Sequence, residues 1–466
     1  MMTDLAPRLL TALEEIVGAA YVRTDADARA VFGRDRTSSW PAQPCAVVLP
    51  ANIEQVQAVV RLAHAEQLAI VPSGGRTGLS GGAVASQGEL VLALDRLRQI
   101  SDFDPIDRSV RVGAGVITAE LQQWAEEQGL FYPVDFASAG SSQIGGNIAT
   151  NAGGIKVIRY GMTRDWVRGL KVVTGDGRLL DLNQGLLKNN AGYDLRHLFI
   201  GSEGTLGVIV EATMGLIRPP GELAVLVLAV ADMDAVMQVL HRFQQDIDLT
   251  AFEFFSEAAL QKVMAEMKLP RPLAEAADFY ALLEFERRDD EAEAQVMSLF
   301  EDCVDQGWVL DGVMSQSLEQ RRNLWRLRED ISEAISRWTP YKNDIAVRVS
   351  RTPAFLRELS ALVAVHHPDF EIIWFGHIGD GNLHLNILKP ENMDGAVFFA
   401  RCHQLSELVF EVVHKHEGTV SAEHGVGLLK KDHLHYSRSA DELALMKALK
   451  QVFDPQGIMN PGKIFD

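Results

Sequence analysis

Three glycine-rich stretches in the first half of the chain constrain its fold more than any other feature. Residues 72–82, 140–154 and 192–210 combine glycines at short intervals with Ser, Thr and Asn and few charged side chains. Glycine lets a backbone approach a ligand closely, and successive N–H groups can form an anion-binding concavity. Turns and sheet corners would explain one such stretch. Three of them favour a long ligand that the backbone cradles.

The common nucleotide-binding motifs do not account for these stretches. The sequence contains no Gly-x-x-x-x-Gly-Lys-Ser/Thr, and none of its Gly-x-Gly pairs continues to a complete Gly-x-Gly-x-x-Gly. A P-loop and a Rossmann fingerprint are therefore excluded. A neutral cradle fits a dinucleotide whose pyrophosphate is bound by backbone N–H groups.

Length and charge narrow the class of protein. A chain of 466 residues is too long for one hydrophobic core, so two or three domains are expected. The net charge of -19 argues against nucleic-acid binding and against an anionic membrane surface.

Residues 136–155 lack charge but are too polar to span a bilayer, and the N-terminus lacks the pattern of a signal peptide. The three scattered cysteines suit a reducing compartment. These features predict a cytoplasmic protein without a membrane span.

The order of predicted elements changes at residues 219–221, Pro-Pro-Gly. Before this boundary, Asn52 is positioned to cap a helix. Beyond it, strands such as 223–230 alternate with helical segments. This pattern predicts a separate α+β domain, with a long helix over about 318–338 and a strand over 345–349.

Residues 375–387 predict a β-hairpin that could hold a metal ion. Apolar runs flank Asp380-Gly381, a dipeptide that favours tight hairpin turns. Pairing across a two-residue turn would set His377 opposite His384 and place Asn386 on the same face. Two opposed imidazoles lie close enough to share one metal ion.

Residues 421–427 offer a third ligand, because Glu423 stands beside His424 in a glycine-rich segment. Two histidines and a glutamate form a known catalytic zinc set with an open position. The alternative reading is a pair of polar residues on a half-exposed strand. That alternative is favoured for a lone histidine, and disfavoured for two opposed histidines together with a Glu-His pair in a glycine-rich segment.

From about residue 40 to the C-terminus, the chain resembles one flavoprotein superfamily. Residues 72–78, 144–154, 159–161 and 201–207 resemble the FAD-binding domain of the vanillyl-alcohol oxidase / p-cresol methylhydroxylase superfamily. Residues 376–386, 421–425 and 460–463 resemble its D-2-hydroxyacid dehydrogenase branch, and most closely the members that act on D-2-hydroxyglutarate.

This resemblance implies a fold and a division into domains. It implies an α+β protein with a two-subdomain FAD-binding domain of the p-cresol methylhydroxylase type. An α+β cap domain with an antiparallel sheet would bind the substrate, and a C-terminal segment would return to the flavin. We expect these parts at residues 1–220 (core about 41–219), 221–425 and 426–466.

The resemblance also assigns residues to the cofactor. Some relatives attach FAD through a histidine in the first loop, where this chain has Arg76 and Thr77, so non-covalent FAD is expected. The residues expected to contact FAD are Pro72, Ser73, Gly74, Gly75, Arg76, Thr77, Gly78, Ser80, Asp135, Gly140, Ser141, Gly145, Gly146, Asn147, Thr150, Asn151, Gly153, Gly154, Gly204, Ile209 and Asn460.

The implied reaction is oxidation of D-2-hydroxyglutarate to 2-oxoglutarate, with hydride transfer to flavin N5. Zinc or another divalent metal, held by His377, His384 and Glu423, would bind the substrate, and His424 would act as the general base. Asn386 resembles an active-site residue of the family.

A second set of residues is predicted to bind a distal carboxylate. Arg328 and Ser332 are four apart on the predicted long helix, hence on one face, and Lys342 follows. The alternative for Arg328 is a surface ion pair. Arg348 departs from the family pattern, and its effect is open.

Alternative activities are oxidation of D-lactate or glycolate on the same fold, a non-redox flavin-dependent transferase, or a non-catalytic flavin subunit. The chain has no haem motif and no iron–sulfur cysteine set, so reduced flavin needs a diffusible acceptor. The resemblance implies an electron-transferring flavoprotein in that role, and a homodimer.

Overall fold

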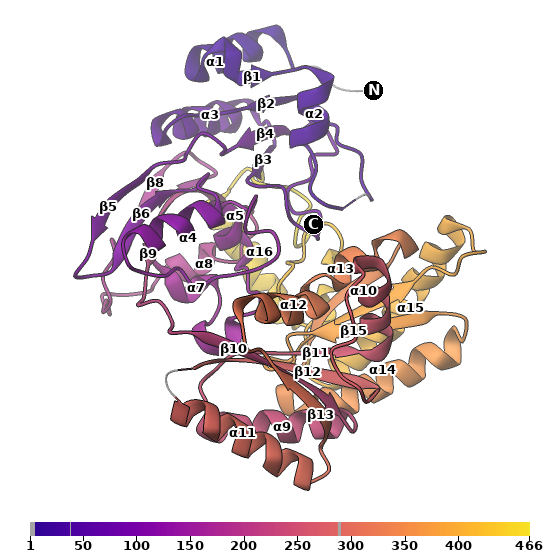
Figure 1. Ribbon diagram of the computed structural model, residues 1–466. Coiled ribbons are helices and arrows are strands. Elements are labelled where there is room, and N and C mark those ends of the chain that lie inside the picture. The colour runs from indigo at the N-terminus through magenta and orange to yellow at the C-terminus, as the bar shows by residue number, and fades with distance from the viewer. Residues whose placement is uncertain (1–4, 38, 288–289) are drawn as a thin grey trace. The chain divides into compact units, whose positions relative to one another are not determined.

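The structure is a computed structural model that describes residues 5–37, 39–287 and 290–466. Internal contacts divide the chain into two compact units, which are coloured along the chain in Figure 1. Unit 1 comprises Met1–Gly153, Met162–Pro219 and Glu423–Asp466, and unit 2 comprises Gly154–Gly161 and Pro220–Ala422. Among the described residues, no helix combines the length and apolar character needed to cross a bilayer.

Unit 1 begins with a four-stranded sheet in the order β1-β2-β4-β3. Strands β2, β3 and β4 are parallel, whereas β1 pairs antiparallel with β2. Strands β2 and β4 are buried and apolar, as expected for a sheet covered by helices. The elements of this part are α1 (Pro7–Val17), η1 (Ala19–Tyr21), β1 (Val22–Arg23), α2 (Ala26–Phe32), β2 (Ala46–Val48), α3 (Ile53–Glu66), β3 (Ile70–Ser73) and β4 (Leu90–Ala93).

A five-stranded antiparallel sheet, in the order β5-β6-β9-β7-β8, forms the second part of unit 1. Helix α5 packs on β9 and β6 and carries the middle glycine stretch. The elements are β5 (Ile100–Asp104), β6 (Ser109–Gly113), α4 (Thr118–Glu127), α5 (Ile144–Thr150), α7 (Thr163–Trp166), β7 (Val167–Thr174), β8 (Leu179–Leu182), α8 (Arg196–Phe199) and β9 (Gly207–Gly215).

The C-terminal segment completes unit 1. It contains η4 (Lys431–Tyr436) and α16 (Ala440–Phe453). The ring of Phe453 packs edge-on against Phe199 with centroids 4.9 Å apart. Beyond α16, Met459 forms a parallel bridge with Ile70 of β3. The last residues of the chain are thus built into the sheet that carries the first glycine stretch.

Unit 2 is organised around a seven-stranded sheet in the order β13-β10-β12-β11-β15-β16-β14. Every neighbouring pair in this sheet is antiparallel. The strands are β10 (Leu223–Val230), β11 (Leu249–Ser256), β12 (Phe279–Glu286), β13 (Val309–Met314), β14 (Tyr341–Ala346), β15 (Glu371–Gly376) and β16 (Asn382–Leu388).

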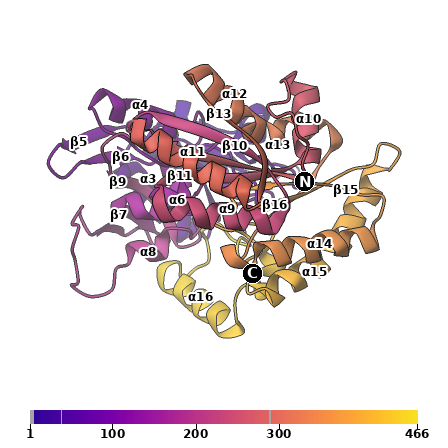
Figure 2. The ribbon, with the colours of Figure 1, turned by 60° about the horizontal axis from the view of Figure 1, so that its bottom comes forward.

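Helices lie on both faces of this sheet. In Figure 1, α9 and α11 lie on one face and α12 and α10 on the other. Figure 2 shows α14 and α15 side by side. The helices are α6 (Val157–Tyr160), α9 (Met233–Asp246), α10 (Glu257–Met267), α11 (Asp290–Asp305), α12 (Leu318–Glu329), α13 (Ile331–Ala334), η2 (Ser336–Trp338), η3 (Val349–Arg351), α14 (Thr352–His366) and α15 (Gly395–Lys415).

Several predicted elements are confirmed. The side chain of Asn52 caps α3, and β10 spans the predicted residues. The prediction of one long helix over 318–338 is wrong, because α12 ends at Glu329 and Asp330 turns to a ψ of -1° before α13. Buried apolar residues keep their helical spacing through this break, so the sequence pattern does not reveal it. The strand predicted over 345–349 is β14, which lies further towards the N-terminus.

Candidate functional site

The glycine stretches of unit 1 line one cavity. It is formed by the loop after β3, by α5 and by the segment that enters β9. Gly75 is required for close packing, because a Cβ atom there would lie 2.2 Å from the Ser141 carbonyl oxygen. At Gly146 a Cβ atom would meet nothing within 4 Å, so this residue opens onto the cavity. The backbone therefore leaves room for a ligand at close range.

Most residues expected to contact FAD line this cavity, together with others that the sequence did not single out. The expected residues at the cavity are Pro72, Gly74, Gly75, Arg76, Thr77, Gly78, Ser80, Gly145, Gly146, Asn147, Thr150, Gly204 and Ile209. The further lining residues are Asp35, Gly82, Ala83, Leu94, Gln143, Ala149, Glu203 and Gly207. The expected residues outside its lining are Ser73, Asp135, Gly140, Ser141, Asn151, Gly153, Gly154 and Asn460.

Two features of the cavity fit a polar, non-covalently bound cofactor. The buried side-chain oxygen of Gln143 has no hydrogen-bond partner among the described residues. The described residues that line the cavity include no His, Cys or Tyr that could form a covalent bond to a flavin. Buried polar atoms are rarely left unpaired, so a ligand donor is expected at Gln143.

The guanidinium of Arg76 stabilises the first glycine-rich loop, residues 72–82, through three contacts. It donates to the Gly74 carbonyl oxygen at 2.6 Å and pairs with Asp95 at 2.8 Å. It also stacks over the ring of Phe32, with its Cζ 4.5 Å from the ring centroid. Arg76 therefore holds the loop in a strained conformation, with φ +61° at its own backbone.

A larger side chain at Gly146 should block cofactor binding. We expect Gly146→Leu to fold and to lose most of its FAD, because the new side chain would project into the cavity. Flavin content is measured in the supernatant after acid precipitation, and folding by circular dichroism.

Gly140→Leu is the matched control for this prediction. A Cβ atom at Gly140 also meets nothing within 4 Å, but Gly140 is exposed and lies outside the cavity lining. Equal flavin loss in both variants, or full flavin in Gly146→Leu, would contradict the cavity as the FAD site. Flavin that stays with the wild-type pellet would contradict non-covalent binding.

Glu203 joins the C-terminal segment to the cavity. Its carboxylate accepts hydrogen bonds from the backbone N–H groups of Val426 at 2.7 Å and Gly427 at 2.8 Å. Asn460 donates to the Glu203 carbonyl oxygen at 2.7 Å and to the Gly82 carbonyl oxygen at 2.8 Å. Two separate parts of the tail are therefore fixed at the same edge of the cavity. This role of Glu203 was not predicted.

The stability of the protein should depend on the protonation of Glu203. Burial raises the pKa of its carboxyl from 4.5 to about 7. The folded state then binds a proton that the unfolded state releases, so the free energy of unfolding should fall as pH rises from about 4.5 to about 7. The expected contribution is about 3 kcal/mol. Glu203→Gln should lose this slope in urea denaturation followed by flavin fluorescence, and an unchanged slope would contradict the assignment.

The hairpin of unit 2 exists, but its predicted register is wrong by two residues. Phe375, not His377, pairs with His384, and Ile373 pairs with Asn386. The predicted two-residue turn is a loop over residues 377–381, in which the N–H groups of Asp380 and Asn382 both donate to the His377 carbonyl oxygen. A shift of two residues preserves the face of each side chain. The rings of His377 and His384 still lie with centroids 5.3 Å apart.

One face of the sheet in unit 2 gathers the polar residues of the predicted site. In the register of β14 and β16, Asp344 lies opposite His384, and Lys342 lies opposite Asn386. Opposed residues share a face of a sheet. Asp344 Oδ1 lies 3.8 Å from His384 Nδ1, and this carboxylate also accepts from the Ala422 N–H at 3.1 Å. Asp344 was not predicted as a site residue.

Glu253, on the neighbouring strand β11, was also missed. It is 1% exposed and lies 2.9 Å from His377 Nδ1 through Oε1, and 2.8 Å from Arg328 Nη2 through Oε2. The guanidinium of Arg328 also stacks over Phe375, with its Cζ 4.7 Å from the ring centroid. A glutamate inside a strand that is buried throughout is the one sequence signal that could have identified it.

The predicted carboxylate-binding residues differ in their surroundings. Arg328 is buried, whereas Ser332 and Lys342 are exposed. The helix predicted to carry both Arg328 and Ser332 is interrupted at Asp330, which lies between them. Nε and Nη2 of Arg328 are buried without hydrogen-bond partners among the described residues, although Nη2 is close to Glu253. The ion pair therefore lacks hydrogen-bond geometry.

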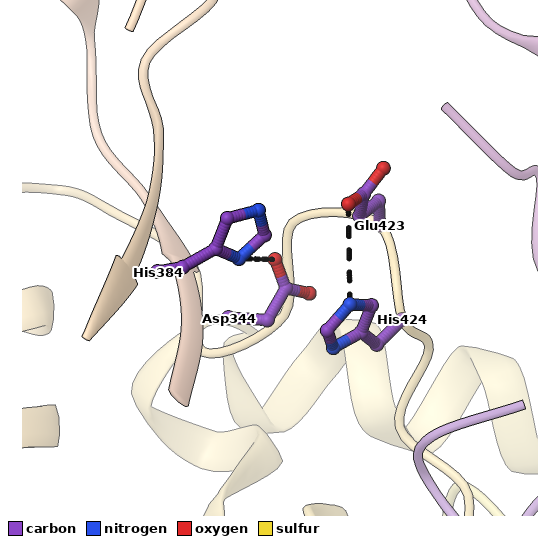
Figure 3. A group of neighbouring side chains, drawn as sticks. All are labelled: Asp344, His384, Glu423 and His424. Carbon is purple, nitrogen blue, oxygen red and sulfur yellow. Dashed lines mark ion pairs between the residues drawn. The ribbon is translucent and has the colours of Figure 1, made fainter. Parts of the chain in front are cut away.

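Glu423 and His424 begin the last segment of unit 1, directly after Ala422. Glu423 Oε1 and His424 Nε2 lie 3.9 Å apart, so the two side chains turn towards each other, as Figure 3 shows. Gly425, the next residue, has φ +85°, a conformation that glycine adopts without steric cost. Figure 3 draws the side chains of Asp344, His384, Glu423 and His424, and each offers one atom of a type that can bind a metal ion.

Comparison with known proteins gives concordant matches. Residues 44–183 match the family described as "FAD binding domain", and residues 219–464 match "FAD linked oxidases, C-terminal domain". The chain is 61% identical to the D-2-hydroxyglutarate dehydrogenase of Stutzerimonas stutzeri, over 100% of both chains. It is 53% identical to the D-2-hydroxyglutarate dehydrogenase of Xanthomonas citri pv. viticola, over 100% of this chain and 98% of the other.

A solved structure supports the fold independently. Crystalline p-cresol methylhydroxylase with bound substrate aligns with a TM-score of 0.76 at 15% identity, over 98% of this chain and 96% of the other. The predicted α+β architecture of the p-cresol methylhydroxylase type is thereby confirmed.

Proposed function

The chain belongs to the FAD-linked oxidase family as an FAD-dependent hydroxyacid dehydrogenase, and from this premise we propose that it oxidises D-2-hydroxyglutarate to 2-oxoglutarate with the help of a divalent metal ion. The substrate is proposed from two relatives of high identity that carry this activity in their names. The cavity of unit 1 fits FAD by its open backbone and by the unpaired oxygen of Gln143.

The observation that carries the substrate proposal is the buried guanidinium of Arg328. It is 5% exposed and keeps two nitrogen atoms without hydrogen-bond partners among the described residues. A carboxylate is the natural acceptor for a planar guanidinium, which can donate two parallel hydrogen bonds. In this proposal the metal ion binds the C1 end of the substrate, and Arg328 binds its distal carboxylate. Ser332 and Lys342 would contribute further donors.

The residues proposed to hold the metal ion are His377, His384 and Glu423. Two imidazoles and a carboxylate are a donor set that suits zinc, with a position left for substrate. Asp344 supports this set, because it lies opposite His384 and accepts from the backbone of Ala422, the residue before Glu423. The donor chemistry therefore fits a divalent metal.

The chain's own residues would perform three tasks in the reaction. FAD would supply the hydride acceptor at N5, and the metal ion would supply the Lewis acid that lowers the pKa of the substrate hydroxyl. His424 would accept the hydroxyl proton at Nε2. Asn386 would hydrogen-bond the substrate, and Arg328 would fix its far end.

Substrate preference tests the proposal. We expect kcat/KM for D-2-hydroxyglutarate to exceed that for D-lactate by about 10²-fold, or ~3 kcal/mol. D-lactate offers no acceptor to the two guanidinium nitrogen atoms that lack hydrogen-bond partners among the described residues. D-malate should fall between the two, and L-enantiomers should be inert. The measurement is anaerobic bleaching of the flavin with each acid. Arg328→Ala should remove most of the gap between diacid and monoacid.

Arg326→Ala is the control on the same helix. Arg326 is partly exposed and pairs with Asp330 at 2.9 Å, so its loss should leave the ratio of the two substrates unchanged. If Arg328→Ala slows both substrates equally, Arg328 orients the C1 carboxylate or the helix, and the diacid proposal loses its support.

One observation favours a second candidate, oxidation of D-lactate or glycolate. Glu253 already lies 2.8 Å from Arg328 and neutralises its charge without a substrate. A site of this kind could serve a monoacid. The substrate panel separates the two candidates, since a D-lactate dehydrogenase would show no preference for the diacid.

An electron-transferring flavoprotein as acceptor, a homodimeric assembly and a cytoplasmic location stay predictions of the sequence.

A further inference from the structure

We infer that Glu253 is a positioning residue that fixes His377 for metal binding and couples it to Arg328. The inference rests on the proposed metal site. It concerns a residue that neither binds the metal ion nor touches the substrate in the proposal. Both of its oxygen atoms are engaged within unit 2, one by a proposed metal ligand and one by the proposed substrate clamp.

The geometry sets the tautomer of His377. A carboxylate accepts hydrogen bonds and does not donate them, so at 2.9 Å the Glu253 Oε1 atom requires the proton of the ring on Nδ1. The lone pair is then on Nε2, the atom that a metal ion would need. A carboxylate that binds the second nitrogen of a ligating histidine fixes the orientation of the ring and raises its basicity.

The same carboxylate restrains Arg328. Its Oε2 atom lies 2.8 Å from Nη2, and the side chains of Glu253 and Arg328 are 1% and 6% exposed. Solvent therefore does not screen this contact. Glu253 lies on β11, the central strand of the sheet, and β16, which carries His384 and Asn386, is two strands away. One buried carboxylate therefore contacts both a proposed metal ligand, His377, and the proposed substrate clamp, Arg328.

A purely structural role is the competing explanation, and unit 2 contains a matched control. Glu284 lies on β12, is 3% exposed and forms an ion pair with Lys156. It also accepts from Trp325 at 2.8 Å and Thr250 at 2.6 Å. Glu284 thus resembles Glu253 in burial and in its cationic partner, but its side-chain partners among the described residues are Lys156, Thr250 and Trp325, none of which belongs to the proposed metal site.

The experiment compares zinc affinity in Glu253→Gln and Glu284→Gln, by elemental analysis after dialysis against a chelator of graded concentration. We expect Glu253→Gln to bind zinc about 10- to 100-fold more weakly than wild type. Glu284→Gln should match wild type, although both variants should melt at a lower temperature. Added zinc should restore the kcat of Glu253→Gln but not that of Arg328→Ala.

The outcomes separate the inference from its premise. Wild-type protein that turns over without bound metal would overturn the proposed metal site. If the wild type binds zinc and Glu253→Gln binds it equally well, only the role of Glu253 is overturned. Equal zinc loss in Glu253→Gln and Glu284→Gln would also overturn it, because a general loosening of the sheet would then explain the effect.

Discussion

Dialysis against EDTA, or the substitution His384→Ala, is expected to abolish turnover while FAD stays bound. His384 lies on β16 in unit 2, whereas the residues that line the FAD cavity all belong to unit 1. The metal ion would supply the Lewis acid that activates the substrate hydroxyl, so its removal should stop oxidation of the substrate. Metal content is measured by elemental analysis, flavin by absorbance and turnover by dye reduction.

His403→Ala is the control for this substitution. His403 lies on α15 in unit 2, is exposed and is 3.4 Å from the Tyr341 hydroxyl, away from the sheet face that carries His384. It should keep metal and activity. An unchanged kcat in dialysed protein that contains no metal would refute metal-dependent catalysis, and parallel loss of FAD would show that the two sites are not independent.

His424→Ala is expected to retain metal and flavin and to lose about 10²- to 10⁴-fold in the rate of flavin reduction, the effect of a positioned base. His424 Nε2 lies 3.9 Å from Glu423 Oε1, so the proposed base stands beside a proposed ligand. Stopped-flow reduction of the flavin under anaerobic conditions measures the step directly.

His435→Ala, in the same C-terminal segment, is exposed and hydrogen-bonds only locally, to the Asp432 carbonyl oxygen among the contacts described. Its rate of flavin reduction should equal that of wild type. If His424→Ala also reduces its flavin at the wild-type rate, the proton is accepted elsewhere and the role of His424 is refuted.

Local signals in the sequence predicted local structure well. The cap Asn52 starts a helix as expected, and Asp380-Gly381 marks a reversal between two strands. The predicted length of that turn, two residues, was wrong, because the dipeptide identifies a turn but not how many residues the loop contains. The loop is fixed by two N–H groups that share the His377 carbonyl oxygen, a contact that no dipeptide encodes.

The residues that support the site could not be found from spacing alone. Glu253 reaches His377 across 124 positions of sequence, and Asp344 reaches His384 only through the pairing of β14 with β16. Strand order in a sheet of seven strands decides these contacts, and a single sequence does not specify that order. The glycine cavity was predictable because its glycines themselves carry the signal, whereas the tail residues that close it are distant in sequence.

The division of unit 1 into segments separated by unit 2 has a consequence for synthesis of the protein. A ribosome completes the strands of the cofactor-binding part early, but Met459 and Asn460, which pair with Ile70 and bind Gly82, emerge only after all of unit 2. Domains generally fold as units during translation. Unit 2 needs no segment beyond Ala422 and can fold first, whereas unit 1 needs the later segment Glu423–Asp466. A chain truncated after Ala422 should therefore contain a folded unit 2 and a flavin cavity that lacks its C-terminal contacts.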